Sequence, residues 1–349
     1  MERFRKIAFI IEHSPNKGYY PFERASILAS LLNRTASIYV FVKQANHDSI
    51  EKFISNQLTP IEFESYKQLL PTLKNLQLDL VVLDGEDSTI DLVKQLNNYC
   101  PTIVHFDDFG IGAKSSLFHF KALYEENIDT VEQNEVTGPY FFIGSPLLKS
   151  IKHQRLLRTP SMPATNTPPH IAIYYEDGDQ PNLTYRTLRH LTQLQIPLQI
   201  SILLDDSYSH STEDLSMMAL SRKNIKIVRG EKAIEAILVN ADCLICNNLY
   251  TPYKAAYINI PCITVASNER ELKLAFGREQ NGFIHIGLGR KMKQSHLQNA
   301  VMEFLLHEPI RKRALERQQK IGFDINENIL SDLFMELAHQ RYNISSLLK

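Results

Sequence analysis

Acidic and histidine side chains stand near the ends of three apolar segments in the first part of the chain. They are His13, Asp84 and the pair Asp107 and Asp108. Side chains of these types can transfer protons to or from a bound molecule. If the three segments are neighbouring parallel strands, their carboxyl ends meet at one edge of a sheet, where ligands bind in such folds. The ordinary alternatives stay open: a loop histidine is commonly only solvated, and an aspartate pair can cap a helix.

A loop in the second half of the chain has the character of an anion site. Residues 247–252 join an apolar segment to a helical one, and Thr251 is the expected N-cap, with Pro252 as the first helical residue. A helix N-terminus offers unpaired N–H groups and a partial positive charge, which suit a phosphate. Tyr250, beside Thr251, adds a ring that can stack on a sugar or pack in the core.

Apolar segments and amphipathic segments alternate along the whole chain, which predicts parallel, doubly wound α/β sheets. The predicted strands cover residues 6–11, 37–42, 61–63, 80–84, 102–106, 170–175, 198–204, 225–228, 243–246, 262–266 and 282–286. The predicted helices cover residues 21–33, 49–55, 66–73, 89–96, 185–194, 213–220, 231–238, 253–258, 296–306, 309–321 and 326–340.

The chain is long enough for two domains. Its 349 residues exceed one ordinary domain, and residues 159–169 hold four prolines without apolar periodicity, which is typical of an extended linker. We therefore expect two Rossmann-like domains, 1–158 and 170–325, that face a cleft. The segment 326–349 is expected to carry a helix that can cross back to the first domain.

Composition excludes several classes of protein. A net charge of −1 gives no basic field for nucleic acid, and no apolar run approaches the roughly 18 residues of a membrane span. Four cysteines without a disulfide pattern favour a reducing compartment, and we expect the protein in the cytoplasm. Cys243 and Cys246 form a CxxC inside a predicted strand, where they would point to opposite faces, so they are interpreted as buried cysteines. We expect neither a metal nor a cofactor.

Four short segments carry a resemblance to a known family. Residues 18–24 read Gly-Tyr-Tyr-Pro-Phe-Glu-Arg, residues 107–109 Asp-Asp-Phe, residues 137–140 Thr-Gly-Pro-Tyr, and residues 176–184 Glu-Asp-Gly-Asp-Gln-Pro-Asn-Leu-Thr. In order and spacing the chain resembles glycosyltransferase-B-type proteins that handle UDP-sugars. In particular, it is similar to the UDP-sugar hydrolase of the pseudaminic-acid pathway and to the spore coat polysaccharide biosynthesis protein G family. The resemblance implies a cleft between two Rossmann-like domains.

For the first domain, the resemblance implies an altered catalytic loop. The family loop reads Gly-x-Gly-His-x-x-Arg; Gly18 and Arg24 are retained, whereas Pro21 stands at the catalytic histidine. Proline has no proton to exchange, so it cannot act as the base. Asp84 matches the aspartate of the family's Asp-x-Tyr, and His13 lies close enough in sequence to enter the cleft.

For the second domain, the resemblance implies a diphosphate site. The family turn Gly-Gly-Ser-Asp-Pro-x-Asn-Leu-Thr faces the diphosphate; Asp179, Asn182 and Thr184 are retained, and Glu176 and Asp177 replace the two glycines. Each new carboxylate would repel a phosphate by roughly 1 to 4 kcal/mol at about 4 to 6 Å in a partly wet cleft, unless it points outward or holds Mg²⁺. The family's Gly-Gly-Ser-Thr-Thr loop corresponds to residues 248–252, with Lys254 at a family glutamate. Asn268 matches the Asn of Asp-Asn-Gln.

These observations predict a nucleotide-sugar protein, UDP-linked, of surface or spore-coat polysaccharide synthesis. Its hydrolytic activity would be altered or lost, with Asp107 or Asp108 as the replacement base and Thr251 and Asn268 near the diphosphate. Two alternatives are a non-catalytic binding or scaffold protein of the same fold and an active glycosyltransferase.

Overall fold

The computed structural model describes residues 4–15, 17–125, 135–157, 167–323 and 327–341. The chain divides into two compact units: unit 1 is residues 1–143 and 323–349, and unit 2 is residues 144–322. Helix α5 (Pro146–Leu157) belongs to unit 2, because Arg155 donates hydrogen bonds to the carbonyl groups of Leu238 (2.7 Å) and Ile258 (3.1 Å). The division therefore precedes α5, earlier than the expected boundary at residue 158. Residues 158–166 of the expected linker lie outside the described residues.

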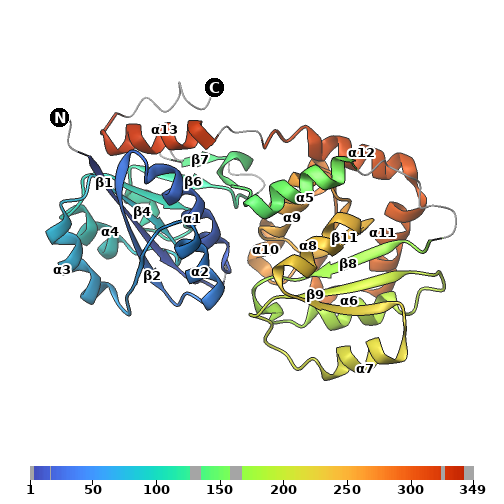
Figure 1. The fold of residues 1–349 in the computed structure, drawn as a ribbon. Helices are drawn as coiled ribbons and strands as arrows, with labels where there is room; N and C mark the ends of the chain where they lie inside the picture. The colour runs from blue at the N-terminus through green and yellow to red at the C-terminus, as the bar shows by residue number, and fades with distance from the viewer. Residues whose placement is uncertain (1–3, 16, 126–134, 158–166, 324–326, 342–349) are drawn as a thin grey trace. The chain divides into compact units, whose positions relative to one another are not determined.

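Unit 1 is built around a seven-stranded sheet (Figure 1). Its strands are β1 (Arg5–Glu12), β2 (Ala36–Lys43), β3 (Pro60–Glu62), β4 (Leu80–Asp84), β5 (Ile103–Phe106), β6 (Phe118–Lys121) and β7 (Glu135–Thr137). Its helices are α1 (Tyr20–Leu32), α2 (His47–Ser55), α3 (Tyr66–Leu76), α4 (Ile90–Asn97) and α13 (Glu327–Ala338), with 3₁₀ turns η1 (Ala113–Ser115) and η2 (Pro139–Phe141). The strand order is β3-β2-β1-β4-β5-β6-β7, and neighbouring strands pair in parallel.

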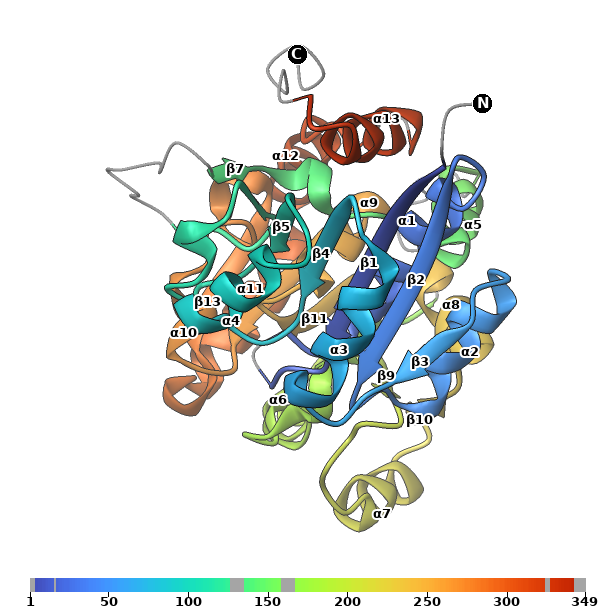
Figure 2. The same ribbon diagram turned by 90° about the vertical axis from the view of Figure 1, so that its left-hand side faces the viewer.

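Helices cover both faces of this sheet. Figure 2 shows α3 and α4 on one face, where Leu73 of α3 packs in a cluster with Ile10 and Leu83 of the strands. On the other face, Phe334 of α13 stacks on Phe106 of β5, with ring centroids 5.9 Å apart. Burial on both faces explains why the strands are near-continuous apolar runs. Leu333, Phe334 and Leu337 of α13 are buried, whereas Ile329 remains 36% exposed.

Unit 2 is built around a six-stranded sheet. Its strands are β8 (His170–Tyr174), β9 (Gln199–Leu204), β10 (Ile225–Arg229), β11 (Cys243–Asn247), β12 (Cys262–Ala266) and β13 (Phe283–Leu288). Its helices are α5, α6 (Leu183–Leu191), α7 (Glu213–Ser221), α8 (Glu231–Asn240), α9 (Thr251–Tyr257), α10 (Glu269–Lys273), α11 (Gln294–Leu306) and α12 (Glu308–Gln319), with 3₁₀ turns η3 (Asp177–Asp179), η4 (Glu279–Asn281) and η5 (Gly289–Lys291). The order β10-β9-β8-β11-β12-β13 is again parallel throughout.

The predicted fold class, two Rossmann-like parallel-sheet domains, is confirmed. In each sheet the strand order reverses once, between β1 and β4 in unit 1 and between β8 and β11 in unit 2. Ligands of open α/β sheets bind beyond the carboxyl ends of the strands at such a switch point. Strands β6 and β7 and helix α5 were not predicted. Within the described ranges, no helix is long and apolar enough to cross a bilayer.

Candidate functional site

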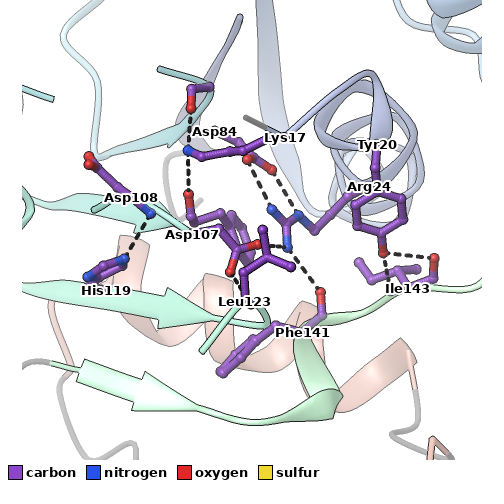
Figure 3. A network of polar contacts seen from close by, with 12 residues as sticks. Lys17, Tyr20, Arg24, Asp84, Asp107, Asp108, His119, Leu123, Phe141 and Ile143 are labelled. Carbon is purple, nitrogen blue, oxygen red and sulfur yellow. Dashed lines mark hydrogen bonds and ion pairs between the residues drawn. The ribbon is translucent and has the colours of Figure 1, made fainter. Parts of the chain in front are cut away.

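The switch point of unit 1 is lined by a buried ion cluster centred on Arg24 of α1 (Figure 3). The guanidinium binds Asp84 through two contacts, Nε to Oδ2 at 2.8 Å and Nη2 to Oδ1 at 3.0 Å. Its Nη1 donates to Oδ2 of Asp107 at 2.9 Å. The three side chains are no more than 1% exposed. Burial raises the pKa of Asp84, and the adjacent guanidinium acts against that rise.

Lys17 covers the carboxyl ends of β4 and β5. Its Nζ donates to the carbonyl oxygen of Gly85 and lies 3.4 Å from that of Phe106 (Figure 3). The side chain is buried, and burial lowers the pKa of Lys17, although Asp84 and Asp108 act in the opposite direction. The ammonium group of Lys17, from the loop between β1 and α1, therefore lies at the carboxyl ends of β4 and β5.

Asp107 has a left-handed backbone, with φ 47°, and directs its carboxylate inward. Its Oδ1 accepts from the backbone N–H of Leu123 at 2.7 Å, while Oδ2 is paired with Arg24. Both oxygens thus have partners within the chain. This arrangement holds the segment after β6 to the end of β5.

Asp108 is fixed by a different set of partners. Its Oδ2 lies 2.6 Å from Nδ1 of His105, and its Oδ1 accepts from the backbone N–H groups of Ser88 (3.0 Å) and Gly110 (2.7 Å). Burial alone would raise the pKa of Asp108, but the hydrogen bonds from His105 and Ser88 and the charges of His105 and Lys17 together outweigh burial and hold the pKa well below the usual range. An ionised carboxylate with such partners is a weak base.

Residues of the loop between β1 and α1 have structural roles. Gly18 has φ 65° and donates its N–H to the carbonyl of Ser14 at 2.8 Å, which closes a tight turn that favours glycine. Pro21 lies buried in the first turn of α1. The ring of His13 lies against that of Tyr19, with centroids 4.3 Å apart.

In unit 2, the retained turn residues meet at the start of α6. Oδ1 and Oδ2 of Asp179 accept from the backbone N–H groups of Leu183 and Thr184, each at 2.7 Å. The backbone is left-handed at Asp179 (φ 48°) and at Asn182 (φ 52°), whose Oδ1 accepts from the hydroxyl of Tyr208 at 3.2 Å. Burial raises the pKa of Asp179. The carboxylate of Asp179 thus occupies the N–H groups that a phosphate would use.

Glu176 forms an ion pair with Lys254 of α9, and both side chains are partly exposed, at 13% and 18%. The backbone N–H of Glu176 and the hydroxyl of Thr251 both donate to Oδ1 of Asn247, each at 3.4 Å. The sequence expectation treated Glu176 as an uncompensated charge unless it pointed outward or held a cation. The structure places a cationic side chain on it instead.

The loop before α9 differs in detail from the prediction. Tyr250 is the N-cap, Thr251 is the first helical residue, and both are buried. The hydroxyl of Thr251 turns to Asn247, so it does not cap the helix. Tyr250 is fully buried, so its ring packs within the unit.

Glu271 of α10 is a buried acid that the sequence analysis missed. Its Oε2 accepts from the backbone N–H groups of Asn248 (3.2 Å) and Ser267 (2.9 Å), at the carboxyl ends of β11 and β12. Burial raises its pKa to about 7, against the effect of these bonds. Asn268 caps the same helix, its Oδ1 accepting from the N–H of Glu271 at 2.9 Å. In the sequence, Glu271 lies in a charged run that is typical of a solvated face.

Metal ligands and cysteines show no further site in the part of the chain that the structure describes. No group of three or more His, Cys, Asp or Glu side chains there can hold a metal ion. Cys243 and Cys246 are buried free thiols of β11, and Sγ of Cys246 lies 3.4 Å from Sγ of Cys262.

Comparisons with known sequences give a distant relative. No protein-family model matches the chain. An uncharacterized protein of Methanocaldococcus jannaschii is 23% identical over 279 residues, which are 76% of this chain and 56% of that protein. The chain therefore spans about half the length of this relative.

Comparisons with solved structures give the fold. MurG of Acinetobacter baumannii is similar over 95% of this chain and 99% of its own, with a TM-score of 0.66 and 12% sequence identity. UDP-GlcNAc 2-epimerase of Neisseria meningitidis, bound to UDP-GlcNAc, is similar over 96% of this chain and 100% of its own, with a TM-score of 0.60 and 9% identity. MnaA of S. aureus with UDP is similar over 98% of this chain and 97% of its own, with a TM-score of 0.64 and 13% identity. The fold is of the GT-B type.

Proposed function

We propose that the protein binds a nucleotide sugar, UDP-linked, at the carboxyl edge of the unit 2 sheet, and serves the synthesis of a surface or spore-coat polysaccharide in the cytoplasm. One observation carries the proposal. Over nearly the whole chain, the fold is similar to that of proteins whose structures contain UDP or UDP-GlcNAc. The partly exposed ammonium group of Lys254, beside the unit 2 switch point, supports it.

We further propose that hydrolysis of the nucleotide sugar, as in the resembled hydrolases, is lost or altered. Pro21 stands at the catalytic histidine, and Asp84 and Asp107 are engaged by Arg24. A hydrolase needs a base within hydrogen-bond reach of the attacking water. Asp107, Asp108 and His13 remain the candidates for that base, and the pairing of both aspartates weakens them.

Calorimetry with UDP and UDP-GlcNAc tests the binding, with ADP as the control nucleotide. We expect heat of binding for the uridine nucleotides and a smaller response to ADP. No binding of any uridine nucleotide up to millimolar concentration would contradict the proposal.

An assay of UDP release from UDP-GlcNAc tests the chemistry. We expect little or no release by the native protein. Release that persists in Asp107→Asn and Asp108→Asn variants would exclude both aspartates as the base and leave His13→Ala as the next variant.

A second candidate function is binding without catalysis, as a scaffold or sensor of the same fold. It is favoured by the saturated hydrogen bonding of Asp107 and Asp108, which leaves neither carboxylate poised for proton transfer. Transfer of a sugar to an acceptor also needs a base, so the same observation does not favour an active glycosyltransferase. Binding without turnover in the two assays would support this second function.

A further inference from the structure

The Glu176–Lys254 ion pair joins the loop after β8 to helix α9 after β11, and these two segments flank the unit 2 switch point. Strands β8 and β11 are neighbours, with Tyr174 opposite Cys246. Glu176 follows β8 by two residues, and Lys254 lies in the helix that follows β11. The pair therefore lies across the position where ligands enter folds of this topology.

The backbone beneath the pair is held independently of it. Asn247 is buried at the end of β11, and its Oδ1 accepts from the N–H of Glu176 and the hydroxyl of Thr251. The hydrogen bond from the N–H of Glu176 to Asn247 therefore links the two segments without using the side chains of Glu176 and Lys254.

Several backbone N–H groups at this edge already donate hydrogen bonds to acids of the chain. Asp179 accepts from Leu183 and Thr184, and Glu271 accepts from the N–H groups that follow β11 and β12. Asp205, just after β9, is also within the field of the pair: burial raises its pKa, Glu176 adds to the rise, and Lys254 opposes it. An incoming anion therefore meets buried acids and, at the ion pair, the partly exposed cation Lys254.

We propose that the Glu176–Lys254 pair is an exchangeable latch, in which the phosphate of an anionic ligand takes Lys254 from Glu176. Lys254 is then an anion-binding residue, and Glu176 is a competitor that sets how strongly charged a ligand must be to enter. This inference rests on the proposed function and adds a selection for diphosphate over neutral ligands. A neutral nucleoside cannot make the exchange and is disfavoured.

Two variants separate the roles of the pair. Glu176→Gln removes the competing charge and keeps the shape, so UDP should bind about tenfold tighter. Lys254→Met removes the cation and exposes Glu176 to the phosphate, so UDP should bind at least about tenfold weaker. Uridine, which carries no phosphate, should respond to neither change.

Matched controls remove the effect of overall charge. Glu279→Gln neutralises an exposed acid that lies 3.4 Å from Arg317 and precedes β13, away from the carboxyl edge. Lys312→Met removes an exposed lysine of α12. Neither control should change the affinity for UDP by more than about twofold, because exposed charges are screened. Thermal melting of each variant shows whether it is folded.

Calorimetry with UDP, uridine and inorganic pyrophosphate on these five proteins gives distinct outcomes. Tightening by Glu176→Gln together with weakening by Lys254→Met supports the latch. If the native protein binds UDP and Glu176→Gln binds it equally well, the latch is wrong while the proposed function stands. A third outcome is that pyrophosphate binds more tightly to Glu176→Gln and more weakly to Lys254→Met than to the native protein, while UDP binds no better than pyrophosphate. The latch is then supported, and the proposal of a uridine nucleotide as the ligand is wrong. If none of the five proteins binds UDP or pyrophosphate, the latch and the proposed function are both wrong.

Discussion

The two switch points share a topology and differ in the partners of their buried acids. In unit 1, the cations Lys17 and Arg24 are buried, with carbonyl groups and the carboxylates of Asp84 and Asp107 around them. In unit 2, carboxylates such as Asp179 and Glu271 are buried on backbone N–H groups, and the pair at Glu176 stays partly exposed. Buried charges are costly to separate, whereas a partly solvated pair is weak. The comparison indicates a rigid edge in unit 1 and an exchangeable one in unit 2.

Replacing Arg24 is expected to have the largest effect. The Arg24→Met variant leaves the buried carboxylates of Asp84 and Asp107 without their cation, which should lower the free energy of unfolding by about 3 to 5 kcal/mol. Urea denaturation measures it. The control is Arg5→Met, whose partner Asp79 lies 3.0 Å away in a partly exposed pair and should cost less than about 1 kcal/mol. If both variants lose the same free energy of unfolding, the buried ion pairs of Arg24 are no stronger than the partly exposed pair of Arg5.

Glu271 should give unit 2 a pH dependence. Its pKa rises from 4.5 to about 7 on folding, so the folded protein holds this proton more tightly than the unfolded chain. The resulting stabilisation is complete below about pH 4.5 and is lost as the pH rises to 7, by up to about 3 kcal/mol. Urea unfolding at pH 5 and pH 8 should show Glu271→Gln gaining stability relative to the native protein at the higher pH. Glu269→Gln, at an exposed position, is the control. If the free energy of unfolding changes equally with pH in all three proteins, the carboxyl group of Glu271 does not have a raised pKa in the folded state.

Asp179 should give the smallest of the three effects. Asp179→Ala leaves the N–H groups of Leu183 and Thr184 without their acceptors, at a cost of about 2 kcal/mol in the free energy of unfolding. Asp179→Asn keeps one acceptor oxygen and should lose about half as much. Asp206→Ala, an exposed acid after β9, serves as the control in the same denaturation series. If the alanine variant matches this control, the carboxylate does not hold the start of α6.

Much of the fold was predictable from local patterns. The strand at residues 80–84 was placed correctly because four of its five residues are apolar and a loop follows. The parallel pairing followed from the alternation of strand and helix. Strands β6 and β7 were missed because they are short and carry polar residues such as His119 and Glu135, which makes them resemble loops.

The sequence predicted the position of the candidate site better than the pairing and burial of its side chains. Asp84 and Asp107 were expected at one sheet edge, but their pairing with Arg24 depends on contacts between residues up to 83 positions apart. Lys17 was missed because a lysine between an asparagine and a glycine is typical of a solvated turn, and its hydrogen bond to the carbonyl group of Gly85 joins residues far apart in the sequence. No local pattern distinguishes it from an exposed lysine.

Helix α13 makes unit 1 a discontinuous body in the chain. Phe334 lies against the rings of Phe106 and Phe120, while the residues that connect it to them in sequence include all of unit 2. During synthesis, residues 144–322 emerge from the ribosome before α13 does. Unit 2 can therefore mature first, and the earlier segments of unit 1 must wait with an apolar surface uncovered until their last helix arrives.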